Sequence, residues 1–385
     1  MKPFLLGFAP CIDSSPFMST DGAFRSVGEN TGNLAFCYAI DRQLGGGLSS
    51  FLWHTPASVI DAQAGIGVIT LANQLGAHVD YSYLVKGFRA IQSPLVGIGL
   101  GAQAGSADVV PEVPKGTLDW IRAIQDRSLH GAPNIGVRGD YSLSVLEHYG
   151  LGKRALVTGC PTLFINPDVN LGGLIASRFV ATGTGCVAVS AGHQRWHHLQ
   201  RIEASLAAIA MASGGAYVTQ SPLEMVTLGR GDFDGLDEGT EAALRAYIAP
   251  QMSLHEFRAW ATSHAQAFFS AAAWMEYLRR FDFVVGTRIH GVMLGLQSGI
   301  PGLCVAHDSR TRELCETMKV PFVMASQVLQ GMTRDDLTTL FDFDPDAFDA
   351  NRRARARDYV EFLRSNGLVP DSYLVKLADS GRANA

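Results

Sequence analysis

Short apolar runs alternate with stretches of helical spacing along most of the chain. In the amino-terminal half the apolar runs cover residues 68–72, 94–100, 134–137 and 155–158, and in the other half they cover 186–190, 216–219, 282–286 and 302–306. The stretches with helical periodicity include 118–128, 141–149, 202–211, 264–279, 289–298 and 310–318. Continuous apolar runs of this length are typical of strands buried on both faces, which need helices on either side. The alternation therefore predicts an α/β fold with mainly parallel sheets.

The length of the chain and one break in the alternation predict two domains. At 385 residues the chain exceeds the size at which a single core usually stops growing. The glycine-rich stretch 169–185 has no clear period, and we interpret it as a linker. We predict a Rossmann-like domain over residues 1–175, a second over 176–345, and a carboxyl-terminal helix and tail over 346–385. The two domains are expected to face a cleft, with ligands at the carboxyl ends of the strands.

The predicted terminal helix carries a cluster of basic residues, namely Arg352, Arg353, Arg355 and Arg357. Acidic lipid or glycan would be attracted to such a cluster. Because acidic side chains flank the arginines, we interpret the cluster as a solvated helix face.

Charge and cysteine usage exclude several classes of protein. The 31 Lys and Arg residues are outnumbered by 36 Asp and Glu, which argues against a nucleic-acid partner. Pro10, Asp13 and Pro16 interrupt the apolar amino terminus, and no run reaches about 18 apolar residues, so we expect a soluble, cytoplasmic protein. The six cysteines form no C-x-x-C pair and are expected to be reduced. His193 and His197 lie in what we interpret as a polar loop, so no metal site is expected.

The most informative segment runs from Gly286 to Gly291, where an apolar strand ends and a helical period begins. The first turn of a helix offers unpaired N–H groups to an anion, and Arg288 adds a planar guanidinium suited to carboxylate or phosphate. His290 follows in the first turn, where an imidazole can exchange a proton near neutral pH. The segment predicts a functional site with Arg288 and His290 at its centre.

Two further arginines follow apolar runs in the same way. Arg310 follows the run 302–306, and we expect it on the same rim of the sheet as His290. Asp308 before it is expected either to assist or to cap the next helix.

Arg138 follows the run 134–137 and is expected to point into the interdomain cleft. We interpret Gly139 as a sharp-turn residue and Asp140 as the cap of the following helix. A surface ion pair is the alternative interpretation of Arg138.

A loop near the amino terminus offers a second kind of site. Asn30-Thr31-Gly32-Asn33 precedes a stretch of helical period, and a glycine-containing loop that opens a helix suits an anionic or sugar group. The segment 97–103 is only superficially similar to a dinucleotide fingerprint and lacks its acidic partner. We interpret it as a close-packed turn, with Gln103 as a candidate sugar contact.

At these residues the chain resembles the polysaccharide pyruvyl transferase family, over about residues 28–323. The strongest match runs from Gly286-Thr-Arg288-Ile-His290-Gly291 through Gly299-Ile-Pro301 to Asp308-Ser-Arg310, and it is similar to the family block S-R-x-H-G, G-x-P, Y-D-x-K. Three shorter matches keep the family's order: Asn30-Thr-Gly32-Asn33 for N-x-G-D, Val137-Arg138 with Ser142 for V-R-x-x-x-S, and Gly159-Cys160-Pro161 for G-D-P.

The resemblance implies a glycosyltransferase-B-like architecture and phosphoenolpyruvate as donor co-substrate, with no cofactor. His290 matches the family's general acid/base, and Arg138, Arg288 and Arg310 match donor-anion contacts. The arginines would hold the carboxylate and phosphate while protonated His290 gives a proton to the methylene carbon; a sugar hydroxyl then attacks, phosphate leaves, and a second hydroxyl closes a ketal. The implied acceptor is a sugar or lipid-linked oligosaccharide of a bacterial surface glycan, with peripheral contact at the cytoplasmic membrane face and the oligomeric state left open.

Several positions depart from the family pattern. Asn33 and Cys160 stand where the family has acidic residues, His307 where Tyr is usual, and Arg310 where Lys is usual. A strand end that is glycine-rich in the family is Leu-Ala-Asn-Gln-Leu-Gly over residues 71–76. We interpret the chain as a divergent subgroup with its own acceptor. The candidate acceptor contacts are Asn30, Gly32, Asn33, Asn73 and Gln103.

Two other functions remain as alternatives. The first is a nucleotide-sugar-dependent glycosyltransferase or epimerase of the same architecture, in which Glu313 or Glu316 would bind a ribose. The second is a catalytically silent glycan- or anion-binding relative, suggested by the altered acidic positions.

Overall fold

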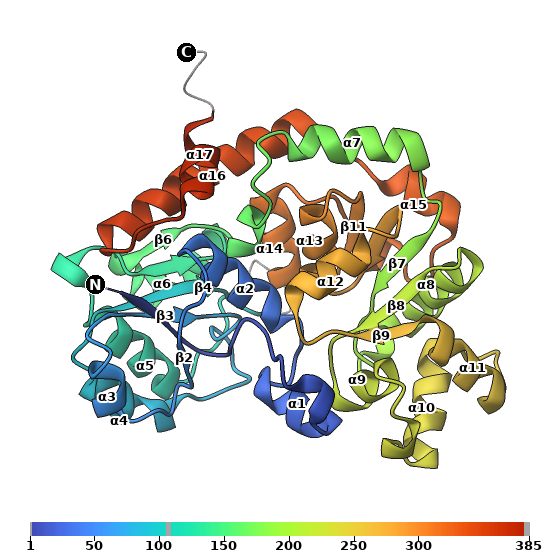
Figure 1. Ribbon diagram of the computed structural model, residues 1–385, viewed down its shortest axis with the longest axis horizontal. Coiled ribbons are helices and arrows are strands. Elements are labelled where there is room, and N and C mark those ends of the chain that lie inside the picture. The colour runs from blue at the N-terminus through green and yellow to red at the C-terminus, as the bar shows by residue number, and fades with distance from the viewer. Residues whose placement is uncertain (1, 105–108, 381–385) are drawn as a thin grey trace.

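The computed structural model describes residues 2–104 and 109–380, and within these ranges the chain forms two parallel β-sheets of six strands each (Figure 1). The first sheet has the order β2 (Ser50–Phe51), β1 (Pro3–Leu6), β3 (Ile66–Thr70), β4 (Leu95–Leu100), β5 (Ile135–Val137) and β6 (Ala155–Val157). The second has the order β12 (Phe322–Met324), β11 (Gly302–Ala306), β10 (Phe283–Gly286), β7 (Val187–Ser190), β8 (Ala216–Thr219) and β9 (Ala265–Ala267). The predicted α/β class, with two Rossmann-like units in a glycosyltransferase-B-like arrangement, is confirmed.

The strand order of the second sheet places a crevice beside β10. Numbered within their own unit, its strands follow the order 3-2-1-4-5-6 of dinucleotide-binding folds. The direction of winding reverses between β7 and β10, and ligands in such sheets bind beyond the carboxyl ends of the strands at that point. In the first sheet the corresponding reversal lies at β1, which pairs with β2 on one side and with β3 on the other.

Helices cover both sheets because the inner strands β3, β4, β7, β10 and β11 are buried on both faces. Around the first sheet lie α2 (Asn33–Gln43), α3 (Ala57–Asp61), α4 (Ser82–Ala90), α5 (Lys115–Gln125) and α6 (Asp140–His148). Helix α1 (Thr20–Ser26) packs instead against α9 (Leu223–Gly229) of the second unit. Helix α5 shows the pattern: Trp120, Ile121 and Ile124 are wholly buried in the core, while Lys115 and Arg122 pair with Asp119 near the surface. Such an apolar stripe at helical spacing fixes the face that the helix turns toward the sheet.

The second sheet is covered by α8 (Gln200–Ala212), α9 (Leu223–Gly229), α10 (Glu238–Ile248), α11 (Leu254–His264), α12 (Ala271–Leu278), α13 (Ile289–Gln297), α14 (Ser309–Met318) and α15 (Arg334–Leu340). The predicted helix over 264–279 is wrong in its first part, because α11 ends at His264 and the edge strand β9 follows before α12 begins. In the described parts of the chain no helix has the length and apolar character needed to cross a bilayer.

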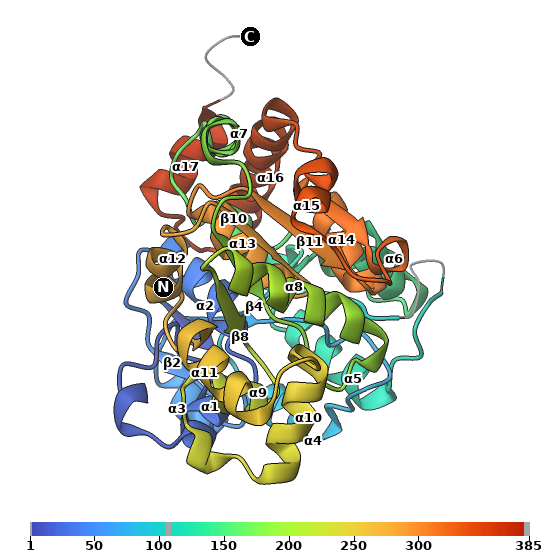
Figure 2. The same cartoon turned by 90° about the vertical axis from the view of Figure 1, so that its right-hand side faces the viewer.

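The predicted linker at 169–185 is largely a helix, α7 (Leu171–Thr182). It packs against α16 (Pro345–Ser365), and both views show these two helices together with α17 (Ser372–Asp379) on one side of the molecule (Figures 1 and 2). Helix α16 returns the chain to the first unit, where the Asp371 amide donates to the Gln43 carbonyl at 2.7 Å. The carboxyl-terminal helices therefore tie the two units together.

The expectation of a solvated arginine face on α16 is wrong for Arg352, which is wholly buried. Its guanidinium donates to the backbone carbonyls of Leu163, Asn166 and Asp168. These carbonyls lie in the segment that leaves the first unit, so Arg352 satisfies backbone acceptors that have no helix or strand partner.

Candidate active site

A small cavity of about 40 Å³ lies where the carboxyl ends of strands from both units meet. The first unit contributes Asn30, Asn33, Ala72, Asn73 and Arg138, and the second contributes Gln220, Thr287, Arg288, Ile289, His290 and Arg310. The structure thus brings together Arg138, Arg288, His290 and Arg310, the residues predicted for catalysis and donor binding, which come from three separate segments of the sequence. Of the predicted acceptor residues, Asn30, Asn33 and Asn73 line this same cavity.

Arg288 and His290 are positioned by the junction of β10 and α13. Arg288 is the amino-terminal cap residue of α13, and His290 follows in its first turn, as predicted. The Arg288 guanidinium donates to the Ser221 hydroxyl at 2.5 Å and stacks 4.6 Å from the centre of the Trp196 ring. These two contacts fix the direction of the side chain.

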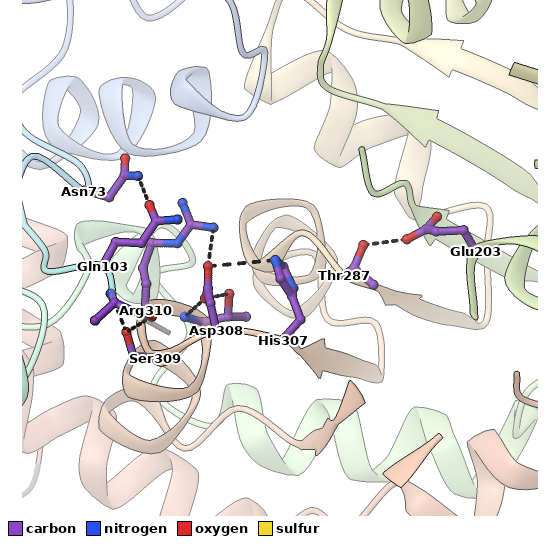
Figure 3. Close-up of polar contacts among 10 residues, drawn as sticks. Asn73, Gln103, Glu203, Thr287, His307, Asp308, Ser309 and Arg310 are labelled. Atoms are coloured by element: carbon purple, nitrogen blue, oxygen red, sulfur yellow. Dashed lines mark hydrogen bonds and ion pairs between the residues drawn. The ribbon is translucent and has the colours of Figure 1, made fainter. Parts of the chain in front are cut away.

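The buried carboxylate of Glu203 stabilises the β10–α13 junction through hydrogen bonds. It accepts from the Thr287 hydroxyl at 2.6 Å (Figure 3), the Tyr217 hydroxyl at 2.9 Å and the Gly192 amide at 3.1 Å. Burial raises the pKa of Glu203, and the three donors oppose that effect. Because Gly192 follows β7 and Thr287 follows β10, Glu203 bridges the winding reversal of the second sheet.

Arg138 follows β5 and is only 2% exposed. Two predictions around it are wrong. Gly139 has a φ of −173°, which any residue adopts, and a Cβ there would lie 2.6 Å from the Glu313 side chain, so glycine is needed for close approach. Asp140 is not the cap of α6; Glu313 from the other unit accepts from the Ser142 amide and hydroxyl, both at 2.7 Å.

Arg310 lies in the first turn of α14 and pairs with Asp308 at 3.2 Å (Figure 3). Asp308 is also the cap of α14, where it accepts from the Thr311 amide at 2.7 Å. The expectation that Asp308 caps this helix is confirmed, and the same carboxylate orients Arg310.

The three guanidinium groups have donors without partners. Among the described residues, nothing accepts from Arg138 Nε and one terminal nitrogen, from Arg288 Nε, or from Arg310 Nε, although all four atoms are buried. Burial, with repulsion from Arg310, lowers the pKa of Arg288 to about 10. Buried cationic donors are stable when an anion satisfies them. The cavity is therefore built to bind a small molecule with several negative charges.

His290 lines the same cavity as the three arginines. Burial lowers the pKa of His290 well below its usual range, and Arg138, Arg310 and Arg288 lower it further. Its Nε2 lies 3.8 Å from Cys160 Sγ, and its ring packs 5.4 Å from that of Phe36. The low pKa favours the neutral imidazole in the free protein, whereas the acid role that the family resemblance implies needs a protonated one.

Gly32 and Gln103 do not line the cavity directly. A Cβ on Gly32 would lie 2.4 Å from the Gln220 amide oxygen, so glycine lets the loop approach the second unit. The Asn73 amide nitrogen donates to the Gln103 amide oxygen, which places Gln103 one side chain away (Figure 3). Asn33 donates to the Val27 carbonyl at 2.9 Å, an interaction that fixes the loop.

Three residues at the site were missed by the sequence analysis: Gln220, Thr287 and Glu203. Gln220 follows β8 and donates to the Ser190 hydroxyl at 2.8 Å. A polar residue directly after a buried strand is the signal that identifies Gln220 and Thr287, and it is the same signal that identified Arg138. Glu203 lies in a helix and has no such signal.

The carboxylates suggested for a ribose are already engaged. Glu313 accepts from Ser142, and Glu316 pairs with Arg312 at 2.8 Å. Neither lines the cavity of the three arginines. In the described parts of the chain no group of three or more His, Cys, Asp or Glu side chains could hold a metal ion.

Fold and cavity together define a two-unit α/β protein with a cavity lined by three arginines and a histidine between its units. A family model described as polysaccharide pyruvyl transferase matches residues 30–309, and the chain belongs to this family. No curated protein matched the chain in a sequence search. Among solved structures, the S. aureus MnaA–UDP complex is similar over 96% of this chain and 98% of that one, at 9% identity and a TM-score of 0.47. A UDP-N-acetylglucosamine 2-epimerase is similar over 97% and 98%, at 10% identity and a TM-score of 0.40.

Proposed function

We propose that the protein transfers the pyruvyl group of phosphoenolpyruvate to a sugar and forms a ketal. The observation that carries the proposal is the set of three buried arginines with unsatisfied donors around one histidine. Phosphoenolpyruvate is small and presents a carboxylate and a phosphate, which together offer enough acceptors for these donors. Membership of the family supports the same donor.

The arginines and His290 divide the chemistry between them. Bidentate contacts from Arg138, Arg288 and Arg310 would hold the two anionic groups and stabilise the phosphate as it leaves. His290 would protonate the methylene carbon, which creates positive character at the carbon that bears the phosphate. A sugar hydroxyl attacks this carbon, and a second hydroxyl displaces the phosphate to close the ring.

Binding of phosphoenolpyruvate would itself raise the pKa of His290. In the empty site the arginines hold the pKa of His290 down. The negative charges of bound phosphoenolpyruvate offset the arginine charges, so the His290 pKa rises and the imidazole gains a proton when the donor is present. Protonated His290 would then be present mainly in the complex with phosphoenolpyruvate, where the proton is transferred.

The test is a transfer assay with phosphate release from phosphoenolpyruvate followed by ³¹P NMR, using simple glycosides and lipid-linked oligosaccharides as acceptors. We expect acceptor-dependent release by the wild type and a loss of about 10²- to 10⁴-fold in His290→Gln. Near-normal turnover by His290→Gln would rule out this histidine as the acid. Turnover of a nucleotide sugar with no response to phosphoenolpyruvate would support the glycosyltransferase or epimerase alternative.

A further inference from the structure

A second cavity of about 420 Å³ lies at the junction of the two units. It is lined by Ala77, His78, Gln103 and Ala104 of the first unit and by Trp196, His198, His307 and Asp308 of the second. Its volume falls within the range of roughly 300–1,000 Å³ that is common for small-molecule sites. The cavity of the three arginines is about ten times smaller at about 40 Å³.

Two side-chain pairs connect the cavities. Asn73 lines the arginine cavity and Gln103 lines the second one, and the two amides are hydrogen-bonded. Arg310 lines the arginine cavity and Asp308 lines the second one, and the two side chains pair at 3.2 Å (Figure 3). A molecule in the second cavity is therefore one side chain away from an anion held by the arginines.

The lining of the second cavity has the chemistry that recognises a neutral sugar. Trp196 presents an aromatic ring, which packs against the apolar face of a pyranose, and Gln103 and Asp308 offer an amide and a carboxylate to its hydroxyls. The described lining contains a carboxylate and no arginine or lysine, which disfavours an acidic or phosphorylated sugar. The Trp196 ring also stacks 4.6 Å from the Arg288 guanidinium, so Trp196 contacts both the second cavity and an arginine of the first.

His307 is the buried basic group of this cavity. Its side chain is 6% exposed, its ring lies 4.4 Å from that of Trp196, and its Nε2 lies 3.8 Å from Asp308 Oδ2. Nothing in the described parts of the chain bonds to its Nδ1. Burial, opposed by Asp308 and reinforced by nearby cationic groups, lowers the pKa of His307 to about 4. At neutral pH the ring is uncharged and has a lone pair available for a proton.

We propose that the second cavity binds the acceptor, a neutral sugar with two free hydroxyls, and that His307 accepts the proton of the attacking hydroxyl. This inference rests on the proposed pyruvyl transfer. His290 gives its proton to the methylene carbon, and the first hydroxyl oxygen bonds to the adjacent carbon as its proton passes to His307. The C–O bond to phosphate breaks with its electron pair, and the departing phosphate takes the proton from His307. The second hydroxyl closes the ketal and its proton returns to His290, so both histidines end as they began.

The experiment measures phosphoenolpyruvate binding by calorimetry and phosphate release with methyl β-galactoside, methyl β-glucoside and methyl β-mannoside. Methyl β-glucuronide and glucose 6-phosphate serve as acidic comparisons. His307→Phe keeps a ring against Trp196 and removes both nitrogens, and His307→Ala leaves room for added imidazole. His255→Ala, on the exposed face of α11, is the matched histidine control.

We expect saturable phosphate release with at least one neutral glycoside and weaker release with the acidic ones. Both His307 variants should bind phosphoenolpyruvate within about twofold of the wild type and lose about 10²-fold or more in turnover, and imidazole should restore part of the activity of His307→Ala. A purely structural role would not give this rescue.

Two results would overturn the inference while leaving the donor assignment intact: unchanged glycoside turnover in both His307 variants, or phosphoenolpyruvate binding with no saturation by any neutral glycoside. Failure of the wild type to bind phosphoenolpyruvate would instead remove the proposed function, and the acceptor assignment with it.

Discussion

Cys160 Sγ lies 3.8 Å from His290 Nε2, although the two residues belong to different units and are 130 positions apart. Cys160 is buried, and its sulfur accepts from the Thr162 hydroxyl at 3.1 Å. The side chain of Cys160 therefore lies beside the proposed acid at a position where a carboxylate would raise the pKa of the imidazole.

The first prediction follows from this contact. Cys160→Asp should raise the pKa of His290, because an opposite charge within about 4–6 Å favours the charged form. Since the acid must be protonated, the fall in turnover at high pH should move upward by about one pH unit. Cys160→Asn has the same size without the charge and should leave the pH profile in place. An equal shift in both variants would show that charge is not the cause.

A second prediction concerns proton uptake on binding. At pH 8, where the phosphate of phosphoenolpyruvate is ionised, binding should draw protons from the buffer because it raises the low His290 pKa of the free protein. Affinity should then weaken as pH rises from the His290 pKa of the free protein toward that of the complex, and level off above it. Titrations in buffers of different ionisation enthalpy measure the uptake. His290→Gln should take up fewer protons than the wild type, and equal uptake by the two proteins would place the proton elsewhere.

The third prediction concerns Glu203, whose carboxylate stabilises the β10–α13 junction. Glu203→Gln replaces a carboxylate that accepts three hydrogen bonds by an amide whose nitrogen can only donate. We expect the free energy of unfolding to fall by about 1–3 kcal/mol and donor affinity to fall as well, since Thr287 directly precedes Arg288. Glu276→Gln, with a side chain that is 76% exposed, is the control and should unfold at the same denaturant concentration as the wild type. Wild-type stability in Glu203→Gln would refute this role.

Much of the fold follows from continuous apolar runs. β3, β4, β5, β6, β7, β8, β10 and β11 each overlap a predicted run, because strands buried on both faces need no polar positions. β1 was missed: it has only four residues and begins with Pro3, and its burial depends on pairing with strands on both sides. β9 consists of Ala-Gln-Ala and has no apolar run to detect.

The candidate site likewise contains residues that the sequence predicts and contacts that it does not. Arg138, Arg288 and Arg310 were predictable because each lies within four residues of the end of a buried strand, and the carboxyl ends of parallel strands collect at one edge. The contact between Glu313 and Ser142 and that between Cys160 and His290 could not be predicted, because each joins two units whose relative placement no local pattern encodes. Arg352 was misinterpreted for the same reason, since its carbonyl partners come from a distant segment.

The most direct test of the central claim is a calorimetric titration of phosphoenolpyruvate into the wild type, with UDP-glucose and GDP-mannose titrated in parallel. We predict saturable binding of phosphoenolpyruvate alone, weakened about 10- to 100-fold in Arg288→Ala, which removes hydrogen bonds to charged groups. Arg312→Ala, on an exposed residue paired with Glu316, should retain wild-type affinity. Binding of a nucleotide sugar without phosphoenolpyruvate, or undiminished phosphoenolpyruvate affinity in Arg288→Ala, would contradict the account.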